Sequence, residues 1–259
     1  MNTHAHDQSH HGKPWSDGDH CFQDGVVANP DTFVLGHSIA DWTADWWKSA
    51  VQAPAGAGPL DSALNQSIHQ GKMTFIAGEF DATVHVSAQS PILFPMINAF
   101  DTEGPGIESI TNFVADGRGS YADEARYITD LVQNSIYDAY AKLTKDPGTG
   151  HAQTIFDVHL RGSAASSAGV KSDIFALGAP KPGSWLESVL PLPLDPSIKN
   201  MPFTRSTGDW VEINGLSKGT YSLEFGGNGH AVVDPVTNTT LGGFNEGWGV
   251  AVTDKVIVS

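Results

Sequence analysis

Hydrophobic residues recur with a helical spacing in two segments of the chain. In the first segment Ser38 can cap a helix whose apolar side includes Trp42 and Trp46, since a serine side chain accepts a hydrogen bond from a free amide of the first turn. The breaker-rich run AVQAPAGAGP ends this pattern, so we predict a helix over residues 39–51. In the second segment an apolar stripe with acidic residues in its first turn predicts the longest helix, near residues 121–145.

Most other apolar residues alternate with polar ones or form short runs between Gly and Pro, which is typical of β-strands. Such segments fill residues 72–99 and return after residue 150. Strands before and after one helical insertion favour packed sheets over alternating βαβ units. We therefore predict a mainly β protein, a two-layer antiparallel β-sandwich of jelly-roll-like form with an N-terminal helix and one longer inserted helix. Its core candidates are Phe75, Val84, Val86, Leu93, Phe94, Phe156, Val158, Leu223 and Phe225.

The N-terminal region differs from the rest of the chain. Residues 1–30 are polar, lack periodicity and hold five of the eleven histidines, so they predict a flexible His-rich arm. Irregular histidine spacing of this kind favours weak metal contacts over a defined site. Residues 31–259 are predicted to form one β-sandwich domain, because such folds often reach about 200–250 residues as a single unit.

Amino-acid composition excludes some classes of binding partner. Fourteen Lys and Arg stand against 29 Asp and Glu, and the net charge of −15 would repel nucleic acid and anionic lipid surfaces. The single cysteine, Cys21, excludes an intramolecular disulfide. We expect no membrane insertion, because no apolar run approaches the roughly 18 residues of a membrane span, and the first residues have none of the features of a signal peptide.

Three segments together resemble a set of bacterial secreted or envelope proteins without an established activity. They are WTADWWKSAVQAP at 42–54, GKMTFIAGEF followed by SPILFPMIN within 71–98, and the hairpin-like TGDWVEINGLSKGTYSLEFGG at 207–227. The resemblance implies a secreted or envelope-associated location, with a cytoplasmic one as the alternative because the signal peptide and the cysteine pair usual in these proteins are missing. It implies no catalytic residues.

Two histidines lie on predicted strands. His85 in ATVHVS and His159 in FDVHLRG have apolar neighbours. On one face of a sheet, joined by a carboxylate, they would form a three-ligand Zn²⁺ site with an open position. The alternative is that each is a structural histidine satisfied by a carbonyl or carboxylate.

A predicted loop at residues 98–108 collects oxygen-bearing side chains after a strongly apolar strand. Asn98, Asp101 and Glu103 lie there at spacings of three and two residues. Converging oxygens of this kind suit Ca²⁺, and two carboxyls suit a general acid and base pair. The alternative is a solvated acidic loop. The sequence therefore establishes no cofactor, and Ca²⁺ at this loop and Zn²⁺ at the two histidines are the candidates.

The favoured interpretation is a non-catalytic β-sandwich protein that binds a glycan or another small polar ligand. Aromatic rings beside an amide suit stacking on sugars, so Trp46, Trp47 and Asn98 are the candidate ligand-binding residues. One alternative is a hydrolase or lyase, with or without a metal. Its candidate catalytic residues are Asp101, Glu103, His85, His159 and Arg161. The other alternative is a structural or assembly protein, a homo-oligomer whose sheet edges pair with copies of itself.

Overall fold

The computed structural model describes residues 27–54, 66–68, 73–76, 83–107, 111–179, 181–189, 200–242, 244 and 246–259. The first 26 residues of the predicted arm lie outside this part of the chain. The arm's last residues do not: the amide of Ala28 donates to the carbonyl of Trp210 at 2.8 Å, and Val27 forms a bridge with Val211. These contacts place the start of the described chain against a central strand.

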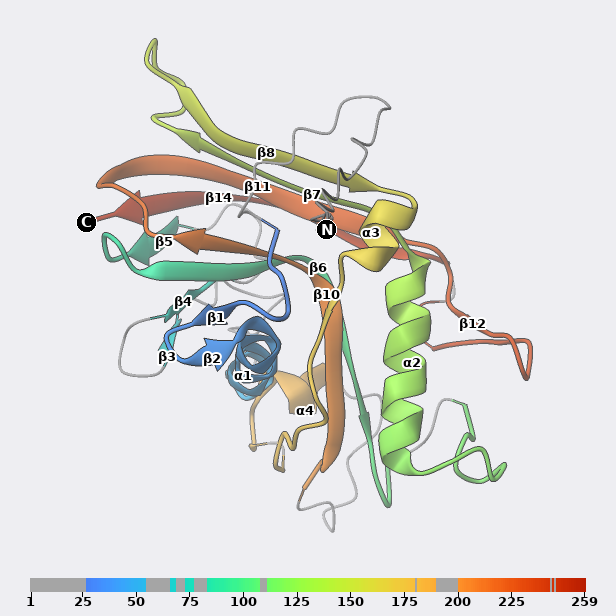
Figure 1. Ribbon diagram of the computed structural model, residues 1–259. Helices are drawn as coiled ribbons and strands as arrows, with labels where there is room; N and C mark the ends of the chain where they lie inside the picture. The colour runs from blue at the N-terminus through green and yellow to red at the C-terminus, as the bar shows by residue number, and fades with distance from the viewer. Residues whose placement is uncertain are drawn as a thin grey trace, which may run out of the picture.

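Two five-stranded sheets make up most of the fold (Figure 1). Sheet I has the order β3-β4-β6-β10-β9, and sheet II has the order β5-β14-β11-β7-β8. The strands of sheet I are β3 (Gln66–Ile68), β4 (Met73–Phe75), β6 (Pro91–Glu103), β10 (Phe203–Asn214) and β9 (Val170–Lys171). The strands of sheet II are β5 (Thr83–Val86), β14 (Trp248–Val258), β11 (Gly219–Gly229), β7 (Ile136–Lys145) and β8 (Gln153–Arg161).

Short ribbons and helices complete the described structure. The ribbons pair β1 (Phe33–Val34) with β2 (His37–Ser38), and β12 (Val233–Asp234) with β13 (Thr239–Thr240). The helices are α1 (Ile39–Val51), α2 (Tyr121–Ser135), α3 (Ser163–Ser167) and α4 (Trp185–Val189). No helix among the described residues has the length and apolar character needed to cross a membrane.

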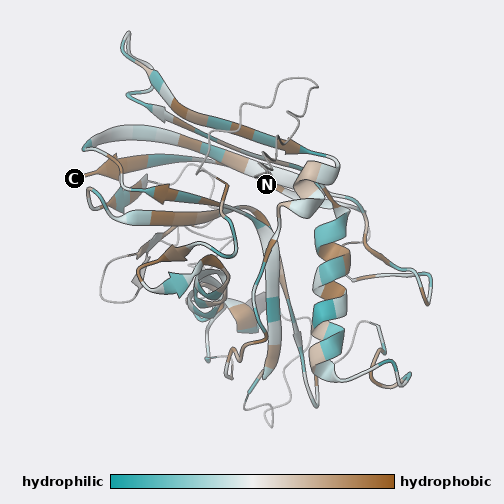
Figure 2. Ribbon diagram, in the orientation of Figure 1, coloured by the Kyte–Doolittle hydropathy of each residue, from teal (hydrophilic) through white to brown (hydrophobic). Residues whose placement is uncertain are grey.

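The long, bent strands β6 and β10 belong to two packing layers (Figure 1). One half of each packs against sheet II, in a core that includes Phe94, Val211 and Phe225. On the other half of β6 and β10, helix α2 covers the face that sheet II covers on the first half. Helices α1 and α4 cover the opposite face, in a second core that is rich in tryptophan. Figure 2 shows the brown and teal bands that alternate along the strands of sheet II, as a half-buried sheet requires.

The predicted mainly β, two-layer architecture is confirmed. All nine core candidates are buried, with at most 3% of each residue exposed. Most strand pairs are antiparallel, but each main sheet also contains one parallel pair, β4 with β6 and β5 with β14. Alternation along β11 does place Tyr221, Leu223 and Phe225 on the inner face, as predicted.

The first helix has the predicted bounds, Ile39–Val51. Its start is fixed by a capping box: the Asp41 amide donates to the Ser38 hydroxyl at 3.1 Å, and the Asp41 carboxylate accepts from the Ser38 amide at 3.2 Å. These bonds satisfy backbone groups that a helix end leaves free.

The second helix prediction is wrong beyond residue 135. Helix α2 ends at Ser135, and residues 136–145 form strand β7 with Ala139, Ala141 and Leu143 facing the core. No Gly or Pro marks the change, and Ala, Lys and Leu are good helix formers. The period-two spacing of the three buried residues was the signal for a strand, and pairing with β8 and β11 decides the outcome.

The hairpin prediction around GLSKG also needs correction. Both flanks are strands, but β10 belongs to sheet I and β11 to sheet II. The turn at 215–218 therefore carries the chain from one layer to the other. This crossing aligns β11 with β14 and β7 rather than with β10.

Candidate functional site

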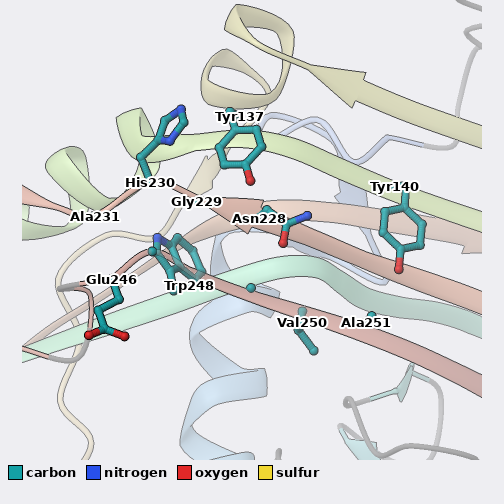
Figure 3. Close-up of a pocket in the computed structure, with 12 residues that line it drawn as sticks. Tyr137, Tyr140, Asn228, Gly229, His230, Ala231, Glu246, Trp248, Val250 and Ala251 are labelled. Atoms are coloured by element: carbon teal, nitrogen blue, oxygen red, sulfur yellow. The ribbon is translucent and has the colours of Figure 1, made fainter.

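An open groove of about 1010 Å³ lies at one end of sheet II (Figure 3). Strands β7, β11 and β14 and the segment 246–247 form it. We call it the tyrosine groove. Its main side chains are Tyr137, Tyr140, Asn228, His230, Glu246 and Trp248.

Strand pairing explains why these side chains meet. Two neighbouring rows cross sheet II on its outer face. The first row is Arg161, Asp138, Asn228 and Gly249, and the second is His159, Tyr140, Gly226 and Ala251. Large side chains come from β7 and β8 and small ones from β14, so the surface is hollowed on the β14 side.

The groove has a ring pair at one end. A β-bulge between Asn228 and Gly229 leaves Tyr137 without a directly paired residue on β11, and 40% of Tyr137 is exposed. The Tyr137 ring stacks on His230, with centroids 4.3 Å apart and an interplanar angle of 24°. Figure 3 shows this pair across from Trp248, with Asn228 lying between Tyr137 and Tyr140. Bulges often re-aim a side chain beside a binding site in this way.

Glycines keep the groove open. A Cβ on Gly249 would lie 2.6 Å from the Asn228 Oδ1 atom, and one on Gly226 would collide with the Tyr140 hydroxyl and a backbone carbonyl. Larger residues at these positions would push Asn228 and Tyr140 from their places. Glycine within a strand often marks such a close approach.

The polar side chains of the groove include an amide, a carboxylate and two phenols. The Asn228 amide donates to Asp138 Oδ2 at 3.3 Å, and Glu246 is exposed at the rim. Burial, together with the negative charges of Asp138 and Glu224, raises the pKa of Tyr140. Its phenol therefore stays protonated at neutral pH and remains a hydrogen-bond donor.

Two predicted catalytic residues, His159 and Arg161, lie beside the groove on β8. His159 Nε2 is 2.6 Å from Asp138 Oδ1, and an Arg161 Nη2 atom is 3.1 Å from His159 Nδ1. Both ring nitrogens of His159 thus have partners. His85 also faces outward, but from β5 at the opposite edge of sheet II. Three strands separate the histidines, roughly 19 Å at the usual strand spacing, so they do not form the predicted shared metal site.

Asp101 and Glu103 lie on β6 rather than in the predicted loop, because residues 98–103 continue the pairing with β10. Glu103 and Glu124 of α2 are buried, with 2% and 0% of each residue exposed. Asp101 Oδ2 and Glu103 Oε2 are buried without a hydrogen-bond partner among the described residues. The structure thus brings these two predicted residues together under α2, beside Glu124.

Burial changes the chemistry of this carboxyl cluster. Desolvation, with the charge of Glu124, raises the pKa of Asp101 to about 8. Desolvation, with the charges of Asp101 and Glu124, raises that of Glu103 to about 9. Both carboxyls are therefore protonated at neutral pH and are poor ligands for a hard cation. Within the described ranges, no group of three or more His, Cys, Asp or Glu side chains could hold a metal ion.

The three predicted ligand-binding residues, Trp46, Trp47 and Asn98, lie away from the groove's tyrosines. Only 1% of Trp46 and 6% of Trp47 is exposed, so neither ring forms a surface platform. Trp47 packs on Phe100 at 4.4 Å between centroids. All three predicted residues nevertheless line one inner cavity, described below.

Sequence reasoning missed the groove itself. The helix predicted near residues 121–145 includes Tyr137 and Tyr140, whereas both lie on the outer face of a sheet. Asn228 and His230 lie in the glycine-rich run FGGNGH, which matches no phosphate-binding loop. The three glycines of this run were the available signal, because glycines close together in a strand indicate a close backbone approach.

Comparisons with protein families, curated proteins and solved structures find no match to this chain. The functional assignment therefore rests on the geometry of the groove and on its chemistry.

Proposed function

We propose that this protein is a non-catalytic β-sandwich protein that binds a glycan or another small polar ligand in the tyrosine groove. The observation that carries the proposal is the exposed Tyr137 ring, held against His230 over a glycine-lined surface. An exposed, pre-positioned aromatic ring loses little side-chain entropy on binding. The resemblance noted in the sequence adds a secreted or envelope-associated location to this proposal.

A sugar ring matches the chemistry of the groove. Its C–H face can pack on Tyr137, while its hydroxyls can bond to polar groups at the edges. Asn228 offers an amide, Tyr140 a phenol and Glu246 a carboxylate. A few polar groups among apolar rings are the usual composition of a small-molecule site.

The negative charge at the groove favours some classes of saccharide over others. Asp138 and Glu246 lie at or beside the groove, and the whole chain carries a net charge of −15. An anionic sugar would meet like charges. We therefore propose a neutral or amine-bearing saccharide rather than a uronate or sulfated one.

The catalytic alternative has less support from the geometry. Asp101 and Glu103 lie under α2 on sheet I, whereas His159 and Arg161 lie on the outer face of sheet II. The carboxyls and the His–Arg pair therefore do not share one site. Catalysis would need them within hydrogen-bonding reach of one substrate.

The test is calorimetric titration with a panel of tetrasaccharides: neutral glucans, mannans and xylans, a chitosan fragment and a polyuronate. We expect at least one neutral or amine-bearing saccharide to bind, and Tyr137→Ala to weaken it at least about 10-fold. Tyr121→Ala is the matched control, because Tyr121 is the first residue of helix α2 and does not line the groove. Its ring stacks on Phe203, with centroids 6.0 Å apart. Preference for the polyuronate, or wild-type affinity in Tyr137→Ala, would contradict the proposal.

A further inference from the structure

A second hollow lies on the inner side of strand β14. It is a partly enclosed cavity of about 190 Å³ between the α1–α4 layer, strand β6 and sheet II. We call it the aromatic cavity. Its main lining residues are Trp46, Trp47, Asn98, Trp185, Phe225 and Trp248.

Strand pairing explains why this space is open. Strand β4 pairs with β6 only at Ile92 and Leu93, so the next residues of β6 have no β4 neighbour. The register between β6 and β10 then shifts, because Trp210 pairs with Pro95 and Asp209 pairs with Ile97, which leaves Met96 between them. Pro95, Met96 and Ile97 all line the cavity.

Two hydrogen-bond donors on the lining residues have no acceptor in the part of the chain that the structure describes. Trp46 Nε1 donates to the carbonyl of Ile76 at 3.2 Å, and Trp248 Nε1 donates to Ser135 Oγ at 3.1 Å. Trp47 Nε1 and Asn98 Nδ2, in contrast, are buried without an acceptor among the described residues. A buried donor left unpaired destabilises the folded state, so an acceptor inside the cavity would be bound favourably.

We propose that the aromatic cavity binds a small neutral molecule with an aromatic or alicyclic body and one carbonyl oxygen, which accepts from Trp47 Nε1 and Asn98 Nδ2. The described lining residues are all uncharged, so a carboxylate would be buried without a cation. A dry engineered cavity of roughly 150 Å³ holds benzene. A volume of about 190 Å³ therefore suits a ring with a short carbonyl substituent.

The ligand enters beside the tyrosine groove. Gly249 is exposed, and Asn98, Trp248 and Val250 are half-buried, so the cavity reaches solvent at strand β14. Trp248, Gly249 and Val250 also line the groove. The cavity is nevertheless a distinct site, because Tyr137 and His230 line the groove alone and Trp46, Trp47 and Asn98 line the cavity alone.

The probes are acetophenone and ethylbenzene, which have similar shapes and differ in the carbonyl oxygen. We expect acetophenone to quench tryptophan fluorescence with a Kd at or below about 1 mM. It should bind about 3- to 10-fold more tightly than ethylbenzene, the usual effect of one net hydrogen bond. Asn98→Leu keeps the side-chain shape and should remove most of this preference while leaving ethylbenzene binding unchanged.

Trp47→Phe removes the other donor and should reduce the same preference. Tyr137→Ala should change neither affinity, since Tyr137 does not line the cavity. Three results would each overturn the inference: no binding of acetophenone at about 1 mM, a carbonyl preference that persists in both donor variants, or loss of binding in Tyr137→Ala. None of them bears on saccharide binding in the groove.

Discussion

The carboxyl cluster under α2 predicts that this protein loses stability as the pH rises. The pKa of Asp101 is raised to about 8 and that of Glu103 to about 9 in the folded chain, whereas in the unfolded chain both lie near 4. At pH values between about 4 and these folded-state pKa values, the folded state binds more protons than the unfolded state. The free energy of unfolding therefore falls with pH, by up to about 1.4 kcal/mol per pH unit for each carboxyl.

The pH range over which stability is lost follows from the same pKa shifts. Below about pH 4 both states are protonated, so the stabilising contribution is fully present. It is lost progressively up to pH 8–9, the folded-state values of the two carboxyls. Glu103→Gln keeps a neutral side chain of similar shape and removes one titrating group. We expect it to be about as stable as the wild type near pH 5 and more stable near pH 8.

Urea denaturation at about pH 5, 6, 7 and 8, at constant ionic strength, measures the effect. The slope of unfolding free energy against pH should be shallower in Glu103→Gln by up to about 1.4 kcal/mol per unit. Glu224→Gln is the matched control, because Glu224 is exposed on β11 and should leave the slope unchanged. Equal slopes in Glu103→Gln and the wild type would show that Glu103 does not take up a proton on folding.

Two further predictions concern packing and a buried ion pair. Phe225→Ala should cost about 3–5 kcal/mol of unfolding free energy in chemical denaturation, because Phe225 is 1% exposed and packs on Phe94 at 5.1 Å between centroids; an unchanged midpoint would place this ring outside the core. Arg118→Met should lower the unfolding free energy, because Arg118 Nη1 lies 2.7 Å from the Asp234 carboxylate and the substitution leaves that carboxylate without its ion-pair partner. Asp234→Asn in the Arg118→Met background should recover part of that loss, and no recovery would show that the unpaired charge is not its cause.

The sequence predicts the elements whose signals are local. Helix α1 has its predicted bounds because the Ser38 cap and the breaker-rich run after it act within a few residues. The core candidates are buried because alternation along a strand defines its inner face. These features need no knowledge of which strands pair.

The sequence does not predict features that depend on distant partners. The change from α2 to β7 at residue 136 depends on pairing with β8 and β11, and the chain has no breaker there. In the sequence, Asp101 and Glu103 indicate a solvated loop, since acidic residues are rarely buried. Their burial depends on α2, which packs over the far half of β6 and β10.

The site was only partly predictable for the same reason. The sequence predicts a ligand site with aromatic rings and an amide, but Trp46 and Trp47 line an inner cavity, and the exposed ring of the groove is Tyr137. Tyr137 faces outward through a bulge that appears only when β7 and β11 pair. Bulges depend on register, which a single sequence specifies weakly where strands contain several glycines.

The most direct test of the central claim, ligand binding in the tyrosine groove, is amide NMR of the protein titrated with a saccharide that binds it. We expect the largest shifts on Asn228, Gly229, His230 and Gly249, which line the groove. Shifts confined to the strands that bear Asp101 and His85, with these four signals unmoved, would contradict the claim.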